Sequence, residues 1–209
     1  MVKALICTLG FDTDPVVRRI VGSRLEEGGI LLLLTAEPLR PETESAINDI
    51  KGLVDKAYLG SVKVEVKAIN PRNFHEAVST IRKELERFKH DEVVLNLSGG
   101  MRALVLSAYT AYLIAGLKKA KLIVDLEARQ GTVELPPIAS LLTTPPQLTE
   151  EKLKILTLLQ QPKTPHELSE ALDKDLTTIY RHLRDLEDLK LIEREDRIVK
   201  LSNLGKMLV

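Results

Sequence analysis

The sequence of 209 residues has no tryptophan, only 3% aromatic residues and a single cysteine, Cys7. One cysteine excludes an internal disulfide and a zinc cluster built from cysteines, and it is typical of proteins in a reducing compartment. The N-terminus has no signal-peptide pattern. The longest uncharged apolar run, Ala103 to Leu117, is shorter than the roughly 20 residues that a transmembrane helix needs. We therefore expect a cytoplasmic protein with no membrane partner.

A surplus of charge of one sign is also missing. Lys and Arg total 30 and Asp and Glu total 30, so the formal net charge at pH 7 is zero. Without an overall basic surface, any binding of nucleic acid must depend on local patches of charge. Hydrophobic residues make up 44% and charged residues 29% of the chain, which is typical of a folded globular protein. The length suits one domain or two small ones.

Short apolar runs alternate with longer amphipathic segments as far as residue 126. The apolar runs predict strands at Val2–Leu9, Gly29–Thr35, Val62–Ile69, Glu92–Leu97 and Lys121–Leu126. The segments between them predict helices at Asp14–Glu26, Glu42–Tyr58, Phe74–Lys89 and Gly100–Leu117. Strands that are apolar on both faces and separated by helices indicate an α/β fold with a Rossmann-like, doubly wound and mainly parallel sheet. Gln130–Leu135 is a candidate edge strand.

The alternation stops at a proline-rich stretch, so we predict a Rossmann-like domain at residues 1–135, a linker at 136–148 and a second domain at 149–209. Helices are predicted in the second domain at Thr149–Leu159, His166–Leu172 and Asp173–Asp188. Two strands within Leu191–Leu201 and a last helix at Ser202–Leu208 follow. Three helices and then a β-ribbon is the order of a winged helix-turn-helix domain.

The third helix of this domain is the candidate recognition helix, because its Leu and Ile face points inward and leaves a polar face for the major groove of double-stranded DNA. The candidate DNA-binding residues on this helix and the wing are Thr177, Thr178, Arg181, Arg184, Arg194, Arg197 and Lys200. Arg181 suits a guanine edge or a phosphate. However, residues 149–209 carry 11 Lys and Arg against 12 Asp and Glu. The alternative is that these are ordinary solvated charges on a protein-interaction module.

The sequence lacks the fingerprints of common nucleotide enzymes. It has no G-x-G-x-x-G after the first strand and no G-x-x-x-x-G-K-[ST], which disfavours dinucleotide oxidoreductases and P-loop NTPases. No cluster of His, Asp and Glu has the spacing of metal ligands. We therefore assign no metal site, no cofactor and no catalytic residue.

Two unusual loops follow the first and the fourth predicted strands. In a sheet of order 3-2-1-4-5 these strands are neighbours, and ligands bind outside their carboxyl ends, where the direction of winding reverses. The pair Gly99-Gly100 lets the backbone approach a ligand, Ser98 can cap the following helix, and Arg102 adds a fixed positive charge, which together suit a phosphate. The candidate ligand-binding residues are Thr8, Gly10, Phe11, Asp12, Ser98, Gly99, Gly100, Met101 and Arg102. The alternative is a tight strand-to-helix turn with a surface arginine.

The helix predicted at Gly100–Leu117 is apolar over nearly its whole surface. Such a helix must be buried on both sides. One side covers the sheet, and a second copy of the same helix is the simplest cover for the other. This predicts a twofold homodimer with its two ligand sites near the axis. Burial against the winged helix is the alternative.

The whole chain resembles a CRISPR-associated Rossmann-fold (CARF) protein joined to a winged helix-turn-helix, and most of all the archaeal transcriptional regulators of type I-A CRISPR systems. The resemblance is carried by Leu9-Gly10-Phe11, by Leu97-Ser98-Gly99-Gly100-Met101-Arg102 and by the domain order. It implies a homodimer that binds a cyclic oligoadenylate, expected to be cyclic tetra-adenylate, across its twofold axis. Binding of this ligand then alters how the winged helices engage DNA in antiviral defence. We interpret Phe11 as a plug of the domain rather than as a stacking partner for adenine.

Some relatives of this kind cleave their ring ligand, which gives the alternative function of a ring nuclease whose winged helix is an assembly module. Cleavage requires the ribose 2′-hydroxyl in line with its phosphate, and stabilisation of the developing charge. The basic residue here is Arg102, which stabilises charge but is a poor general acid or base. We therefore expect a sensor rather than an enzyme. A regulator that answers to a different nucleotide is a third hypothesis.

Overall fold

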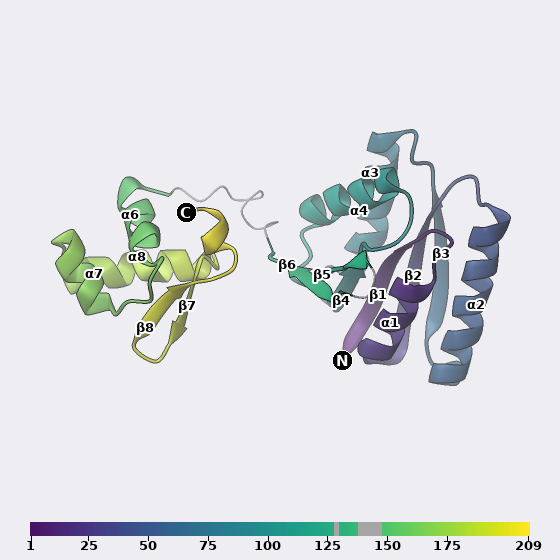
Figure 1. Ribbon diagram of the computed structural model, residues 1–209, viewed down its shortest axis with the longest axis horizontal. Helices are drawn as coiled ribbons and strands as arrows, with labels where there is room; N and C mark the ends of the chain where they lie inside the picture. The colour runs from purple at the N-terminus through teal and green to yellow at the C-terminus, as the bar shows by residue number, and fades with distance from the viewer. Residues whose placement is uncertain (128–129, 138–147) are drawn as a thin grey trace. The chain divides into compact units, whose positions relative to one another are not determined.

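The computed structural model describes residues 1–127, 130–137 and 148–209, and the chain divides into two compact units, Met1–Ala139 and Ser140–Val209 (Figure 1). Most of the linker predicted at 136–148 lies outside the described residues. Each unit has its own sheet and its own buried apolar side chains.

The N-terminal unit is built on a 6-stranded sheet. Its strands are β1 (Val2–Leu9), β2 (Leu25–Ala36), β3 (Lys63–Ile69), β4 (Glu92–Asn96), β5 (Lys119–Asp125) and β6 (Thr132–Leu135). They lie in the order β3-β2-β1-β4-β5-β6; the first five are parallel and β6 pairs antiparallel with β5. This confirms the predicted Rossmann-like, doubly wound and mainly parallel sheet. The first and fourth strands are neighbours, as the prediction requires.

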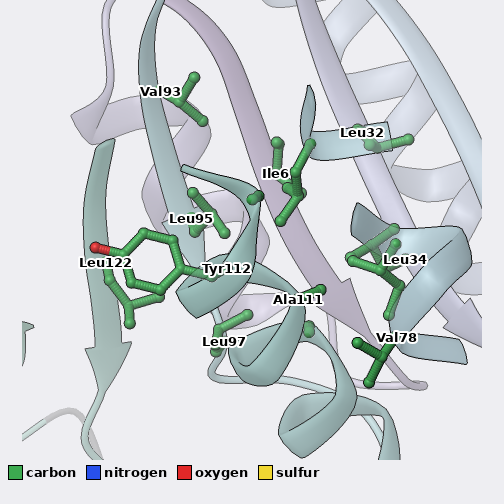
Figure 2. Packing of buried hydrophobic residues seen from close by; sticks show 14 of the residues in the cluster. Ile6, Leu32, Leu34, Val78, Val93, Leu95, Leu97, Ala111, Tyr112 and Leu122 are labelled. Carbon is green, nitrogen blue, oxygen red and sulfur yellow. The ribbon is translucent and has the colours of Figure 1, made fainter. Parts of the chain in front are cut away.

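Helices cover both faces of this sheet, namely α1 (Asp14–Gly22), α2 (Pro41–Tyr58), α3 (Phe74–Glu86) and α4 (Arg102–Ala115). Side chains alternate between the faces along β1, so Leu5 and Cys7 pack with α1 and α2, while Ala4 and Ile6 pack with α3 and α4. Figure 2 shows Ile6 and its neighbours packed between the sheet and the helices. Burial on both faces explains why the strands consist of nearly continuous Leu, Ile and Val.

The structure corrects the start of the second strand. The helix predicted at Asp14–Glu26 ends at Gly22, and β2 begins at Leu25, earlier than the sequence indicates. The charged residues that follow Leu25 are typical of a helix surface. However, Leu25 is only 7% exposed and pairs with Val2, so burial and strand pairing outweigh that local preference.

The helix predicted at Gly100–Leu117 is shorter at both ends. It begins at Arg102, because Gly100 has a φ of +86° in the left-handed region. It ends at Ala115, because Gly116 has a φ of +66° and terminates the helix in the same way.

The C-terminal unit contains α6 (Glu150–Leu158), α7 (Pro165–Leu172) and α8 (Leu176–Asp188), followed by the antiparallel hairpin of β7 (Ile192–Glu195) and β8 (Ile198–Leu201). This is the element order of a winged helix-turn-helix. Its core is made of buried apolar side chains from the helices and the hairpin, including Ile155, Leu168, Ile179, Leu183 and Val199.

The third helix of this unit begins later than predicted. Asp173 has a φ of +50°, which a helix does not allow. The carboxylate of Asp175 then accepts a hydrogen bond from the Thr178 N–H at 2.9 Å and caps the helix. The helix therefore begins at Leu176 and not at Asp173.

The last predicted helix, Ser202–Leu208, is reduced to a 3-10 turn at Gly205–Met207. The Ser202 N–H donates to the Leu191 carbonyl at 3.0 Å, and the Ser202 hydroxyl accepts from the Gly205 N–H at 3.0 Å. These bonds hold the chain against the residue that precedes β7. A Cβ at Gly205 would lie 2.0 Å from the Leu191 carbonyl oxygen, so no other residue fits here.

Candidate functional site

The loops after β1 and β4 pack against each other through glycine backbone. A Cβ at Gly99 would lie 2.7 Å from the Thr8 carbonyl oxygen, and one at Gly10 would lie 3.2 Å from the Gly100 Cα. Gly100 itself has a positive φ, and a Cβ there would lie 3.3 Å from the carbonyl of Leu9. The close approach that these glycines allow is thus between two loops of the protein. That contact fixes the position of both loops at the carboxyl edge of the sheet.

A cleft of about 790 Å³ opens beside these two loops. The predicted ligand residues that line it are Gly10, Phe11, Asp12, Ser98, Gly99, Gly100 and Met101. Thr8 and Arg102 do not line it. Thr8 is 1% exposed, and its Oγ1 has no hydrogen-bond partner among the described residues. Arg102 is the exposed first residue of α4, next to Met101 at the rim of the cleft.

The predicted capping role of Ser98 is wrong. Met101 is the N-cap residue of α4, and no side chain caps the helix. The Ser98 hydroxyl instead donates to Asn96 Oδ1 and accepts the Asp125 N–H at 2.7 Å. The loop is therefore tied back to β4 and β5, and the N-terminal amides of α4 have no side-chain acceptor.

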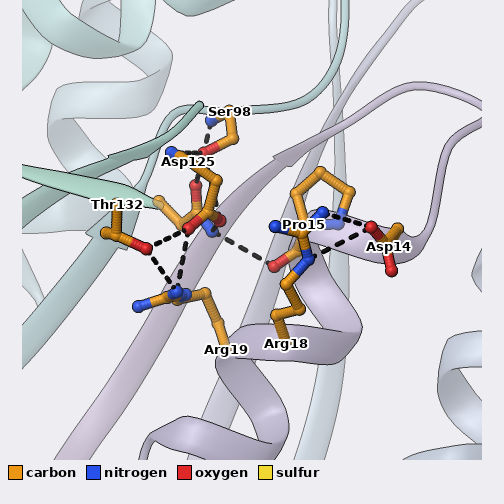
Figure 3. Close-up of polar contacts among 8 residues, drawn as sticks. Asp14, Pro15, Arg18, Arg19, Ser98, Asp125 and Thr132 are labelled. Atoms are coloured by element: carbon orange, nitrogen blue, oxygen red, sulfur yellow. Dashed lines mark hydrogen bonds and ion pairs between the residues drawn. The ribbon is translucent and has the colours of Figure 1, made fainter. Parts of the chain in front are cut away.

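A polar network around the buried side chain of Asp125, which the sequence analysis missed, holds this loop (Figure 3). The side chain of Asp125, at the end of β5, is only 2% exposed, and its carboxylate accepts from Arg19 Nη2 at 2.8 Å and from Asn96 Nδ2 at 2.9 Å. Thr132 on β6 donates to the same carboxylate at 2.8 Å. The network joins α1, β4, β5 and β6 behind Ser98. The sequence did contain a signal for this network, because the apolar strands β4 and β5 each end on a polar residue, Asn96 and Asp125.

The opposite wall of the cleft comes from the loops after β2 and β3, which the sequence analysis did not include. Its polar and charged side chains are Glu37, Arg40, Thr43 and Arg72. Because β2 and β3 are also parallel to β1, their carboxyl ends meet at the same edge of the sheet. The parallel order alone was therefore enough to place these loops at the site.

The interpretation of Phe11 as a plug is wrong. Its side chain is 78% exposed and lines the cleft, while the core beneath it is filled by other residues. Met101, on the other loop, is 50% exposed. Two large apolar side chains therefore stand in solvent at the cleft, where flat apolar ligand groups can stack on them.

One side of α4 is buried and the other is not. Leu104, Ala108 and Ala111 pack on the sheet and α3, as predicted. On the opposite side Leu106 is 59% exposed and Ile114 is 51% exposed. The N-terminal unit alone thus leaves an apolar face of α4 in solvent.

The predicted DNA-binding residues differ in their surroundings. Thr177, Arg181, Arg184 and Arg197 are exposed, and these arginines form no ion pair with a described residue. Thr178 is half-buried, and its hydroxyl donates to the Asp175 carboxylate at 2.8 Å. Arg194 pairs with Glu187 at 3.0 Å, and Lys200 pairs with Glu193 and Glu195.

Three further features concern metal ligands, the cysteine and membrane spans. No group of three or more His, Cys, Asp and Glu residues there is placed to hold a metal ion. Burial raises the pKa of the Cys7 thiol, and the nearby Asp125 carboxylate raises it further. This thiol therefore stays protonated, packs in the core and does not act as a nucleophile. No helix within the described segments is long and apolar enough to cross a membrane.

The doubly wound sheet, the two packed loops and the cleft beside them define a CARF domain, and a second, regulator-type unit follows it. Residues 3–136 match the family model described as the Csa3 CRISPR-associated Rossmann-like domain, and the chain belongs to this family. Residues 147–209 match the model described as the N-terminal domain of the methanogenesis regulatory protein FilR1. The resemblance inferred from the loop motifs is thus confirmed.

The chain is also similar to a solved structure of Can2 from Sulfobacillus thermosulfidooxidans, in complex with cyclic tetra-adenylate. The identity is 13%, the TM-score is 0.45, and the match covers 98% of this chain and 62% of that one. This chain thus spans less than two thirds of the length of that protein. No curated protein matches the chain.

The packing of the two loops predicts a stability difference between two glycine variants of the same unit. Gly99→Ala places a Cβ against the Thr8 carbonyl and is expected to lower stability by about 1–3 kcal/mol. Gly52→Ala, in the middle of α2 with open space around it, is expected to raise stability by about 0.5–1 kcal/mol. Thermal unfolding followed by circular dichroism measures both. Equal melting temperatures for the two variants would contradict the loop contact.

Proposed function

We propose that this chain is a CRISPR-associated transcriptional regulator. In this proposal the CARF unit of a homodimer binds a cyclic oligoadenylate, cyclic tetra-adenylate, and the C-terminal unit binds double-stranded DNA. The observation that carries the proposal is the cleft at the carboxyl ends of β1 and β4, formed by two glycine-packed loops, in a chain that also has a regulator-type unit.

The cleft and its rim suit a phosphodiester. The N-terminus of α4 has no side-chain cap and no acidic residue in its first turn, so its amides and the positive end of the helix dipole favour an anion. Arg102 adds a cation at the same place. Phe11 and Met101 offer apolar surface on which an adenine can stack. A nucleotide presents this combination of phosphate and flat base.

The size of the cleft supports a ligand that is shared between two protomers. Clefts of about 300–1,000 Å³ accommodate drug-sized molecules, and a ring of four nucleotides is larger than these. A twofold axis brings two clefts together around one ring, which has even symmetry itself. The exposed apolar face of α4, with Leu106 and Ile114, is the surface that supports such a dimer.

The C-terminal unit supports DNA binding through a small set of side chains. Thr177 and Arg181 lie on the exposed side of α8, and Arg197 lies at the tip of the hairpin. In a winged helix-turn-helix these positions meet base edges and the flanking phosphates. Arg194 and Lys200 are paired with carboxylates, so among the predicted DNA-binding residues the cations without an ion pair to a described residue are Arg181, Arg184 and Arg197, and a dimer doubles the number of phosphate contacts.

A ring nuclease is the alternative function, and the near neutrality of residues 149–209 is the observation that favours it. Calorimetric titration with cyclic tetra-adenylate, followed by chromatography of the recovered ligand, separates the two. One ring per dimer, recovered intact, supports the sensor. Linear products identify a nuclease, and absence of binding at micromolar protein contradicts both.

Removal of the Arg102 guanidinium is expected to weaken binding of the ring about tenfold, because one charge-assisted hydrogen bond to the ligand is lost. The melting temperature stays unchanged, because the Arg102 side chain forms no ion pair with a described residue. Calorimetry on Arg102→Ala measures this, with Arg24→Ala at the other end of the sheet as the matched control. Equal affinity of both variants would remove Arg102 from the site.

A charge on the exposed face of α4 is expected to separate the dimer. Leu106→Glu replaces a side chain that is 59% exposed in the single chain, so the fold of the protomer tolerates it. Val21→Glu, at a 79% exposed position on α1, is the control. Light scattering is expected to give a monomer mass for the first variant and a dimer mass for the second. Dimers from both variants would place the interface elsewhere.

Arg181→Ala is expected to cost about 1–3 kcal/mol at a specific DNA site if the arginine reads guanine, and to reduce the salt dependence if it meets phosphate. Gel shifts with DNA from the CRISPR locus at two salt concentrations distinguish these contacts. Lys154→Ala, on α6 and paired with Glu150 at 2.8 Å, is the control. No change in affinity or in salt dependence would contradict the assignment of the recognition helix.

A further inference from the structure

The arginines of the N-terminal unit that the structure describes fall into two groups. Arg18, Arg19, Arg82 and Arg87 each pair with a carboxylate. Four others, which form no ion pair with a described residue, are Arg24, Arg40, Arg72 and Arg102. Arg24 precedes β2 at the amino end of the sheet, while the other three lie at the carboxyl edge. Three of these four guanidinium groups thus lie at the edge of the sheet where the cleft is.

Arg40 and Arg72 line the cleft itself, on the wall opposite the two glycine loops. Arg40 is the residue just before α2, and Arg72 follows β3. The glycine wall offers backbone amides to a phosphate, and its only charged side chain in the cleft is that of Asp12, so a cationic side chain inside the cleft has to come from the other wall. The two arginines have the forked donors that bind phosphate oxygens in pairs.

From this arrangement we infer that Arg40 and Arg72 are the residues that select for phosphate inside the cleft, and that they bind the phosphodiester groups of the ligand. The inference rests on the proposed function, because it specifies how the same cleft recognises its nucleotide. Arg102, at the rim, contacts the ligand from outside this cleft.

The carboxylates on the same walls determine what else the ligand must carry. Asp12 and Glu37 line the cleft together with the two arginines, so the four charges balance. A balanced cleft does not attract a polyanion through its overall field. It instead favours a ligand with phosphates for the arginines and with hydroxyl or amino donors for the carboxylates, and nucleotides have both.

Arg40 and Arg72 form their local hydrogen bonds through backbone atoms and not through their side chains. The Arg40 carbonyl accepts from the Thr43 and Glu44 N–H groups at the start of α2, and the Arg40 side chain makes no capping bond. The Arg72 N–H donates to the Asn70 side chain at 3.1 Å. Substitution of either side chain therefore leaves the local hydrogen bonds intact, and a loss of binding reports on the ligand.

The test is the affinity for cyclic tetra-adenylate, measured by calorimetry at two salt concentrations on the full chain. Arg40→Ala and Arg72→Ala are each expected to bind about tenfold more weakly and with a shallower salt dependence. Arg40→Lys keeps the charge but loses the fork, and is expected to recover part of the affinity. Arg24→Ala is the control, and all variants are expected to keep the wild-type melting temperature.

The outcomes separate this inference from the proposed function. If the wild-type chain binds the ring and both alanine variants bind it equally well, with an unchanged salt dependence, the inference is overturned and the proposed function stands. If Arg24→Ala weakens binding as much as the other two, the effect is one of overall charge and the inference is likewise overturned. If the wild-type chain binds no ring, both the inference and the proposed function are contradicted.

Discussion

The close contact between the backbones of the loops after β1 and β4 is the constraint on which the rest of the site depends. Because Gly99 approaches the Thr8 carbonyl more closely than a side chain allows, both loops have fixed positions. Gly100 then directs the chain into α4 with its first amides free of any side-chain cap. The cleft, the exposed Phe11 and the exposed Met101 all follow from this contact.

The network around Asp125 supports that arrangement from behind. A carboxylate that is only 2% exposed is costly to bury unless it is paired and fully hydrogen-bonded, and here Arg19, Asn96 and Thr132 supply the partners. The same network holds Ser98 through its hydroxyl. Burial of this charge costs desolvation energy, and in return the network fixes the loop beside the cleft. This is a use of buried charge that favours precise geometry over stability.

In the proposed function the CARF unit binds the ligand and the C-terminal unit binds DNA. The CARF unit has exposed apolar side chains on α4 and at the cleft, while the C-terminal unit has exposed arginines on α8 and the hairpin. Both sets are exposed to solvent within their own unit. In the proposed regulator, binding of the ligand changes the affinity for DNA only if the ligand prefers one of two arrangements of the proposed dimer. The chain that follows β6 is the covalent connection between the units.

The sequence by itself determined the sheet, its order, the two loops and the helical unit with its hairpin, because these follow from local periodicity and from glycine. It placed Gly10, Ser98 and Gly99 at the cleft for the same reason. Only the tertiary structure decided the start of β2 at Leu25, the role of Ser98 in the Asp125 network and the exposure of Phe11. These depend on contacts between residues far apart in the chain, and such contacts leave no periodic pattern in the sequence.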